Sequence, residues 1–296
     1  MRPCSRRAPG SQRVVPDARP HRHRCTSVEG TAERSRPVAE APAAFAWQNG
    51  ALVETGLAPH HALAAADSWY VSPEGRVRAL DTHRERFLAA TGERMHVDAE
   101  TFWGAAVGRL RSYAGTALFP RVELAQTDSG PQLRLRVRVA PRLRTTTVLA
   151  THAGPDPRTV PRTKGPDLEA LLALRAAAQE DGADELVLLR DGLVVDGSTS
   201  ALLWWRDETL VAPAGDLPRV ASVTARSIRL IATATGTRVV EERARPADLA
   251  GCEVWSVSAL HGITVVDSWI GGPATSARPS RAATWRRRLA ALSRPL

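Results

Sequence analysis

The chain has 296 residues, of which 43% are hydrophobic, and a formal net charge of +9 at pH 7. This apolar content is ample for a packed globular core, and no apolar run is long enough to span a membrane. The excess charge lies at the ends: between residues 1–40 and residues 278–296 the chain holds 25 basic and 27 acidic side chains, which argues against a broad nucleic-acid-binding surface.

The first segment, residues 1–40, is rich in Arg, Pro and Ser and nearly free of large apolar residues. Such a composition cannot bury enough surface to fold alone, so we expect a disordered basic tail there. The last segment, 278–296, is interpreted as a second basic tail. From Trp285 onward it could form a short basic helix, and both a solvated tail and a nucleic-acid contact stay open for it.

The segment 41–150 is expected to form an N-terminal α/β domain. Asn49-Gly50 favours a type I′ turn between two short strands, because both central positions of that turn need a positive φ. Asp81 is expected to cap a helix that ends at Gly92.

A second helix of this domain is expected from about Asp98 to Tyr113, and two strands follow it at 120–126 and 132–141. In the second of these strands, leucines and valines alternate with arginines. This period of two predicts one buried apolar face and one solvated face.

A loop rich in Pro, Gly and Arg, 151–166, is the expected junction to a C-terminal domain of residues 151–277. Pro166 suits the first turn of a helix that stops before Gly182, and a second helix is expected from Ser222 to about Thr235. The rest of this half is predicted to be strand-rich. The predicted strand segments are 185–195, with a turn at Asp191-Gly192, and 201–205, 209–213, 253–258 and 263–269.

The cysteines and histidines give no sign of a metal site. Cys4, Cys25 and Cys252 form neither a disulfide framework nor a spacing typical of metal ligands. The adjacent pair His60-His61 lacks the spacing that places two ligands on one helix face. We therefore expect no metal ion and a reducing, cytoplasmic location.

Lys164 is the only lysine in a chain with 39 arginines. Arginine stays protonated in proteins, whereas a desolvated lysine amine can lose its proton and attack a carbonyl to form a Schiff base. The count alone is equally compatible with a surface lysine that escaped a compositional bias. The neighbouring residues have to decide between these two interpretations.

Four motifs surround this lysine in a fixed order, so the whole pattern has five parts with Lys164 itself. DTHRERF matches an H-x-x-R-[LF] pattern and precedes Lys164; GADELVLLRDGLVVDGSTSALLWW, LPRVASVTARS and SALHGITVV follow it. In order and spacing, residues 45–270 resemble the class IV (fold-type IV) pyridoxal-phosphate enzymes, which include branched-chain and D-amino-acid aminotransferases and aminodeoxychorismate lyase. The resemblance implies an α/β (α+β) two-domain fold with a smaller N-terminal domain, a larger strand-rich C-terminal domain and pyridoxal 5'-phosphate (PLP) in the cleft between them. It also implies a homodimer.

The resemblance implies roles for particular residues. Lys164 would hold the cofactor aldehyde as a Schiff base and then move a proton at the substrate α-carbon. Arg86 would bind the cofactor phosphate, although spacing alone would favour a charge on a helix surface. Asp196 would face the pyridine nitrogen of the cofactor.

A second phosphate contact is implied at the helix start formed by Ser222, Val223 and Thr224, where free amide groups can meet an anion. An ordinary Ser cap explains the same residues equally well, and both interpretations hold if the anion occupies the cap. The last loop, with Ser258 and Ala259, would close over the phosphate or the substrate.

Three weaker assignments concern the substrate. Arg121 is positioned like family arginines that meet a substrate carboxylate, Trp69 falls near the segment that shapes the pocket mouth, and His261 lies in the last loop. The alternatives are a pair between Arg121 and Glu123, a core position for Trp69, and a structural loop role for His261.

The chain departs from the family pattern at three positions: Asp196 replaces the usual Glu, Ala201 the usual Asn, and Glu169 a tyrosine found in some members. These departures argue against the branched-chain subtype. The predicted function is an aminotransferase that moves an amino group between an amino acid and a 2-oxo acid. The alternatives are an aminodeoxychorismate lyase, which converts an amino-chorismate to 4-aminobenzoate and pyruvate, and a catalytically decayed binding protein with nucleic-acid-contacting tails.

Overall fold

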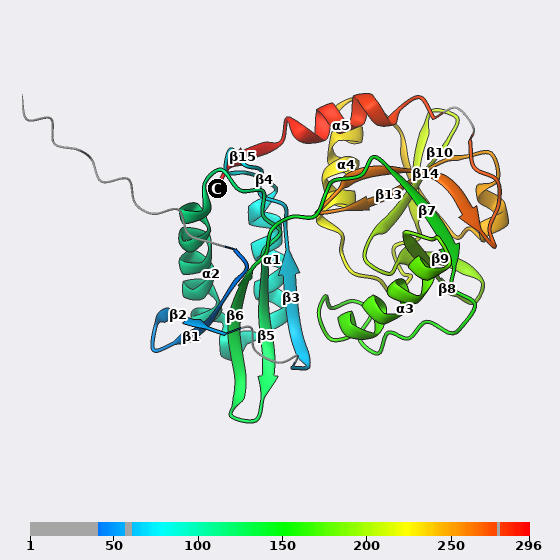
Figure 1. Cartoon of the computed structure of the whole chain (residues 1–296). Coiled ribbons are helices and arrows are strands. Elements are labelled where there is room, and N and C mark those ends of the chain that lie inside the picture. Colours follow the sequence, from blue (N-terminus) through cyan, green and yellow to red (C-terminus); the bar gives the residue numbers. More distant parts are fainter. Residues whose placement is uncertain (1–40, 57–60, 277–278) are drawn as a thin grey trace, which may run out of the picture. The chain divides into compact units, whose positions relative to one another are not determined.

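The structure is a computed structural model that describes residues 41–56, 61–276 and 279–296. The predicted disordered tail at 1–40 lies outside this part of the chain. Within it, a five-stranded sheet, an eight-stranded sheet and a two-stranded sheet are formed, and Figure 1 shows the two larger sheets with their helices. No helix in these ranges is long and apolar enough to cross a membrane.

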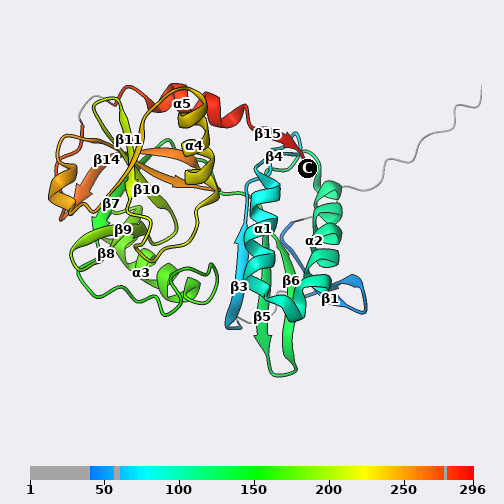
Figure 2. The same ribbon diagram turned by 180° about the vertical axis from the view of Figure 1, so that it is seen from behind.

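The five-stranded sheet is antiparallel and has the strand order β2-β1-β6-β5-β3. Its strands are β1 (Ala43–Gln48), β2 (Ala51–Thr55), β3 (Leu63–Ser68), β5 (Arg121–Thr127) and β6 (Gly130–Val137). Helices α1 (Leu80–Thr91) and α2 (His96–Leu110) cover one face, as Figure 2 shows from behind. Phe87, Phe102 and Trp103 on these helices are buried against Val122 and Leu135 of the sheet.

The local signals in this half are mostly confirmed. Asn49 and Gly50 have φ values of 50° and 77°, as the predicted turn between β1 and β2 requires. Helix α2 ends at Leu110 and a 3₁₀ turn continues it to Tyr113. The predicted cap at Asp81 is wrong: α1 begins at Leu80 with Ala79 as its cap, so Asp81 lies in the first turn.

The arginine face of β6 is the main correction in this half. Leu133, Leu135 and Val137 are buried as predicted, but the opposite face is not solvated, since Arg134 is only 9% exposed. The reason is Glu123 on β5, a fully buried carboxylate that pairs with arginines of this face. The period of two identified the residues that share a face but not what covers that face.

The eight-stranded sheet is mixed and has the order β12-β11-β10-β13-β14-β7-β8-β9. Parallel pairs join β11 to β12, β14 to β7, and β7 to β8, and the other neighbours are antiparallel. The strands are β7 (Thr146–Thr151), β8 (Glu185–Arg190), β9 (Leu193–Gly197), β10 (Ala201–Arg206), β11 (Thr209–Pro213), β12 (Val239–Glu242), β13 (Glu253–Ser258) and β14 (Gly262–Ile270). The chain thus passes from one large sheet to the other between Val137 and Thr146, before the loop where we expected the junction.

The helices of this half are α3 (Leu168–Glu180), α4 (Val223–Ala234) and α5 (Ala282–Ala290). The solvated alternative for the C-terminal segment is wrong, because Trp285 and Leu289 of α5 are buried. Trp285 meets the rings of Trp205 and Trp255 edge-on, at centroid distances of 5.3 and 5.8 Å. The apolar face of this basic helix therefore packs on the core through Trp285 and Leu289. Beyond α5, β15 (Ser293–Pro295) pairs with β4 (Arg76–Arg78).

Candidate active site

A closed polar network joins β3 to α1. The carboxylate of Asp67 is fully buried and accepts hydrogen bonds from His83 Nδ1 at 2.8 Å and from the backbone amide of Ser68 at 2.7 Å. Arg86 donates to the same carboxylate from Nε and Nη2, both at 2.8 Å. Because a carboxylate only accepts, His83 Nδ1 carries the proton of this bond.

The charges of this network balance within the protein. Burial alone would raise the pKa of Asp67, but the Arg86 guanidinium and His83 outweigh it and hold the pKa well below its usual range. Arg86 also donates from Nη1 to the carbonyl of Ala221 at 2.8 Å. The network therefore fixes Arg86 beside the residue that precedes the start of α4.

Lys164 is anchored to the same strand by its backbone. The amide of Ala66 on β3 donates to the carbonyl of Lys164 at 2.7 Å. The next residue, Gly165, has a φ of +134°, and a Cβ on it would stand 2.7 Å from the backbone of Ala65 and Ala66. Only glycine allows the chain to approach β3 this closely, so Gly165 sets the position of Lys164.

The Lys164 amine is poised to lose its proton near neutral pH. Burial lowers its pKa to about 8, and the neighbouring Arg86 guanidinium acts in the same direction. The carboxylates of Asp67 and Asp196 oppose this shift without cancelling it. A neutral amine is the nucleophilic form of lysine.

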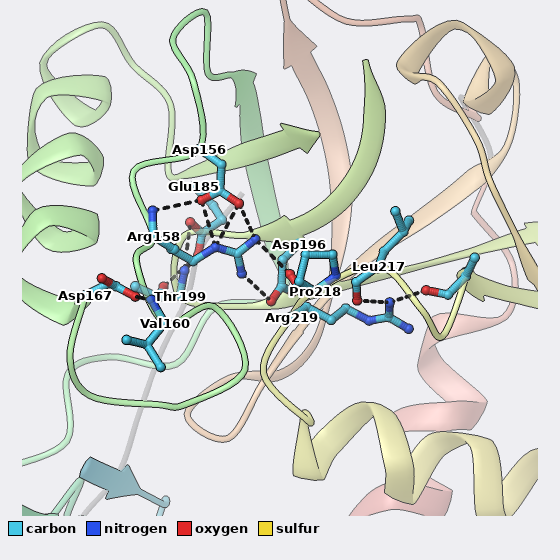
Figure 3. A network of polar contacts seen from close by, with 11 residues as sticks. Asp156, Arg158, Val160, Asp167, Glu185, Asp196, Thr199, Leu217, Pro218 and Arg219 are labelled. Atoms are coloured by element: carbon cyan, nitrogen blue, oxygen red, sulfur yellow. Dashed lines mark hydrogen bonds and ion pairs between the residues drawn. The ribbon is translucent and has the colours of Figure 1, made fainter. Parts of the chain in front are cut away.

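Asp196 lies near the end of β9, next to an irregularity in the pairing of β8 with β9. Its Oδ2 accepts a long contact of 3.4 Å from Arg158 Nη1, which Figure 3 shows beside the much tighter pair of Arg158 and Asp156 at 2.7 Å. Its Oδ1 is buried and has no hydrogen-bond partner within the described residues. Burial raises the pKa of Asp196 to about 7, although Arg158 opposes that shift.

Helix α4 presents an open N-terminus. The side chain of Ser222 accepts a hydrogen bond from the amide of Ala225 at 3.2 Å, which confirms Ser222 as the cap. The amides of Val223 and Thr224 belong to the first turn, where no intrahelical acceptor exists. These two donors and the positive end of the helix dipole are suited to an anion.

The last loop joins β13 to β14. Ser258 Oγ accepts from the amide of His261 at 3.1 Å, and the carbonyl of Ala259 accepts from Arg78 Nη2 at 3.0 Å. Burial and the nearby Arg144 lower the pKa of His261 to about 4, and its Nδ1 lies 3.3 Å from the amide of Arg144 as an acceptor. His261 is therefore neutral and holds the loop in place.

One cavity of about 350 Å³ brings nearly all of the predicted site residues together. These are Arg86, Arg121, Lys164, Asp196, Ser222, Val223, Thr224, Ser258, Ala259 and His261. Trp69 is not among its lining residues: it is 1% exposed and packs on Trp103 at 4.8 Å between ring centroids. The core interpretation of Trp69 therefore fits its position.

A wider cleft of about 1070 Å³ shares Arg86, Lys164 and Ser222 with this cavity but contains neither Asp196 nor Ser258. The chemistry-bearing groups thus converge in the smaller cavity. In the described part of the chain, no three His, Cys, Asp or Glu side chains gather as metal ligands would.

Sequence reasoning missed several residues of this site. Asp67 was missed because a single acid in a short strand carries no motif, and Arg158 because its loop was interpreted only as a junction. Glu185 was also missed; it accepts from the backbone and side chain of Thr199 and so holds the turn after Asp196. An acid at a position of an otherwise apolar strand was the available signal for both Asp67 and Glu185.

Comparison with known proteins gives the class of the chain. A family model for the amino-transferase class IV group matches residues 66–269, which is more than half of the sequence. The chain therefore belongs to the class IV aminotransferases and is an enzyme of that family. A search of curated proteins finds no match.

Solved structures of similar fold support the same architecture. A fold IV-transaminase from Curtobacterium pusillum superposes with a TM-score of 0.68 at 18% identity, over 84% of this chain and 96% of the other. A hypothetical aminotransferase from Mycobacterium tuberculosis, in an alpha-ketoglutarate and PMP bound form, gives 0.72 at 18% identity, over 84% and 98%. A branched-chain amino acid aminotransferase from T.th., with pyridoxamine 5'-phosphate, gives 0.68 at 19% identity, over 85% and 93%. At these identities the likeness shows the fold alone, which is that of fold-type IV transaminases.

Proposed function

We propose that this enzyme is a PLP-dependent aminotransferase that moves an amino group between an amino acid and a 2-oxo acid, with Lys164 as the residue that attaches the cofactor. One observation carries the proposal. The only lysine of the chain, a buried carboxylate oxygen without a partner and an open helix N-terminus line the same cavity. Two of the similar solved structures contain PMP or pyridoxamine 5'-phosphate.

The residues of the cavity fit PLP at three points. Asp196 Oδ1 lacks a partner, and the protonated ring nitrogen of the cofactor is a donor that would satisfy it. The amides of Val223 and Thr224 are donors for the phosphate. Arg86 has five N–H groups, of which three are committed to Asp67 and Ala221, so about two are left for phosphate oxygens.

PLP, when bound, supplies an electron sink for the bond that is broken at the substrate α-carbon. The protein has to provide the proton transfers and the orientation. With a pKa of about 8, the Lys164 amine can both accept and return a proton at neutral pH. Its backbone bond to Ala66 keeps the amine on the cavity wall once its side chain is free.

The ring-nitrogen role of Asp196 depends on charge. A carboxylate at this position keeps the ring nitrogen protonated, and a neutral carboxylic acid does so less well. Burial raises the pKa of Asp196 to about 7 when no cation lies beside Oδ1. A protonated ring nitrogen beside Asp196 would lower this pKa, because an opposite charge favours the ionised carboxyl.

A single lysine permits a direct test of the attachment. The purified protein is incubated with PLP, scanned for a visible absorbance band, reduced with borohydride and digested for mass spectrometry. We expect the band in the wild type and a cofactor label on the peptide that contains Lys164. Lys164→Arg keeps the positive charge but cannot react, so both signals should disappear from it while the thermal unfolding midpoint stays close to that of the wild type.

The same preparations decide the reaction. We expect formation of a 2-oxo acid from an amino acid donor when a second 2-oxo acid is present, and no turnover by Lys164→Arg. Release of pyruvate and 4-aminobenzoate from an amino-chorismate, without amino transfer, would instead identify the lyase. Absence of both the absorbance band and the label in the wild type would refute the proposal.

Four further predictions stay attached to this function. Arg121 is proposed to meet a substrate carboxylate, since it lines the cavity beside its partner Glu123. Ser258, Ala259 and the His261 loop are proposed to close over the phosphate or the substrate. A homodimer and a cytoplasmic location are expected from the family resemblance, and light scattering at several protein concentrations measures the oligomeric state.

A further inference from the structure

The cavity that contains Lys164 is lined by six arginines: Arg86, Arg121, Arg138, Arg144, Arg158 and Arg175. Four of these contact a carboxylate. The four pairs are Arg86 with Asp67, Arg121 with Glu123, Arg144 with Asp184, and Arg158 with Asp156. Among the described residues, Arg138 and Arg175 have no carboxylate within ion-pair distance.

These two arginines differ in how they are held. Arg175 lies on α3 and donates from Nε to the backbone carbonyl of Asp184, whose side chain already carries a negative charge nearby. Arg138 follows the end of β6 and is held by neutral groups instead. Its Nε donates to the carbonyl of Phe119 at 3.0 Å, and its Nη2 lies 3.4 Å from Ser68 Oγ.

The guanidinium of Arg138 is thus fixed in orientation before any ligand binds. Its central carbon stands 5.1 Å from the centroid of the Phe119 ring, and that ring lines the same cavity. Two of its five N–H groups are engaged, so about three donors remain for a ligand. A fork of fixed direction with free donors is suited to a carboxylate.

The sheet behind Arg138 does not neutralise it. Glu123 is the acidic residue of this face, and it is divided between Arg121 and Arg136, whose Nε lies 3.0 Å from Glu123 Oε1. Burial lowers the pKa of Arg138 to about 10, and the positive charge of Arg121 acts in the same direction. An anion in front of these two guanidinium groups would offset their mutual repulsion and favour the charged form of Arg138.

We propose that Arg138 is a carboxylate-binding residue of the substrate site. The proposal rests on the proposed function, because it takes the ligand to be an amino acid or a 2-oxo acid. Such a ligand can offer its α-carboxylate or, when it is dicarboxylic, a second carboxylate. Both sources share the chemistry that Arg138 recognises, and binding measurements distinguish them.

The experiment uses PLP-loaded wild type, Arg138→Met, Arg138→Lys and, as a control, Arg287→Met. Arg287 is exposed on α5 and does not line the cavity, so its removal takes one positive charge from the protein without touching the site. Calorimetric titrations with glutarate and with 4-methylpentanoate measure binding without turnover. Visible absorbance of the same samples measures cofactor occupancy.

We expect Arg138→Met to weaken binding of at least one acid by about ten- to a hundredfold, as the loss of charge-assisted hydrogen bonds predicts. Arg138→Lys should lose less, and Arg287→Met should bind as the wild type does. In turnover assays the loss should appear in KM for the acid substrate more than in kcat. A loss for both acids assigns Arg138 to the α-carboxylate, and a loss for glutarate alone assigns it to the second carboxylate.

Unchanged binding of both acids by a folded, cofactor-loaded Arg138→Met overturns the proposal. If this variant does not fold, Arg138→Lys serves in its place, because it retains the charge but not the planar fork. A failure of the proposed function looks different. In that case the wild type shows no cofactor absorbance, whatever the acids do.

Discussion

Asp67 on β3 and Asp196 on β9 are both buried aspartates close to Lys164, one in each large sheet, and the protein treats them in opposite ways. Asp67 accepts four hydrogen bonds, from the amide of Ser68, from His83 and twice from Arg86. Asp196 receives one long contact from Arg158 and keeps one oxygen unpaired. The pKa of Asp67 is accordingly lowered, and that of Asp196 is raised to about 7.

The difference separates a residue that builds the site from one that serves a ligand. Both oxygens of the fully buried Asp67 accept hydrogen bonds from the protein itself, three at Oδ1 and one at Oδ2, so its carboxylate serves to position Arg86 and His83. A buried oxygen without a partner costs free energy until a donor arrives. Asp196 therefore has an acceptor that a donor of a bound ligand can satisfy.

The largest effect is expected from removing the charge of Asp67. Asp67→Asn removes the charge between Arg86 and His83 and leaves a largely buried guanidinium without its counterion, which should cost about 3–5 kcal/mol of the free energy of unfolding. Urea unfolding at pH 7 measures this loss. Asp81→Asn is the matched control, since Asp81 is exposed in the first turn of α1 and should cost about 1 kcal/mol at most.

Equal stability of Asp67→Asn and Asp81→Asn would contradict the structural role of the network. A smaller loss accompanied by lower PLP affinity would also be informative. It would show that Arg86 is held as much by the Ala221 carbonyl as by Asp67.

These two aspartates also show where sequence reasoning succeeds and where it stops. Ser222 was predicted as a cap and as part of an anion site because capping is a local property of three or four residues. The motif order placed Asp196 in the cavity, although no pattern could show that one of its oxygens lacks a partner. The role of Asp67 depends on a contact between a strand and a helix, because its partner His83 is sixteen residues away in the chain.

The arginines on β6 and directly after it were harder still. Alternation along a strand shows which residues share a face, and Arg134, Arg136 and Arg138 do share one. It does not show that Glu123 of the neighbouring strand is buried, or that Arg138 lines the same cavity as Lys164. Long-range packing buries Arg134 of this apparently solvated face and brings Arg138 into the wall of a cavity.

A second, somewhat smaller effect is expected at Gly165, which brings Lys164 close to β3. Gly165→Ala would place a Cβ 2.7 Å from the backbone of β3 at a φ of +134°, and backbone atoms cannot move aside as a flexible side chain does. We expect a loss of about 2–4 kcal/mol in the free energy of unfolding together with weaker PLP binding, because Lys164 is displaced from β3.

The control for this change is Gly108→Ala in α2. Gly108 is exposed in the helix, and nothing lies within 4 Å of a Cβ placed there. This substitution should stabilise the protein by about 0.5–1 kcal/mol. Similar behaviour of the two glycine variants would mean that Lys164 does not need its close approach to β3.

The smallest effect should come from Asp196→Asn. The change in the free energy of unfolding relative to the wild type should have opposite signs without and with bound PLP. In the cofactor-free protein the raised pKa of Asp196, about 7 against an ordinary value of 3.8, means that the folded state binds more protons between these pH values. Stability contributed by this group is present at low pH and is lost as the pH rises towards 7. Asn does not titrate, so the variant should gain on the wild type by at most about 3 kcal/mol between pH 4.5 and pH 8, within a ceiling of about 4 kcal/mol set by the pKa shift.

Asp67 gives stability the opposite dependence on pH. Because its pKa is lowered, its contribution to the free energy of unfolding is present at neutral pH and is lost only as the pH falls below about 4. Chemical unfolding of wild type, Asp196→Asn and the exposed control Asp128→Asn across this pH range measures the difference. With PLP bound, the order of wild type and Asp196→Asn should reverse, because the ring nitrogen then satisfies the carboxylate and ligand binding adds to stability. A variant that gains nothing as the pH rises without PLP, and loses nothing when PLP is added, would show that Asp196 is an ordinary partner of Arg158.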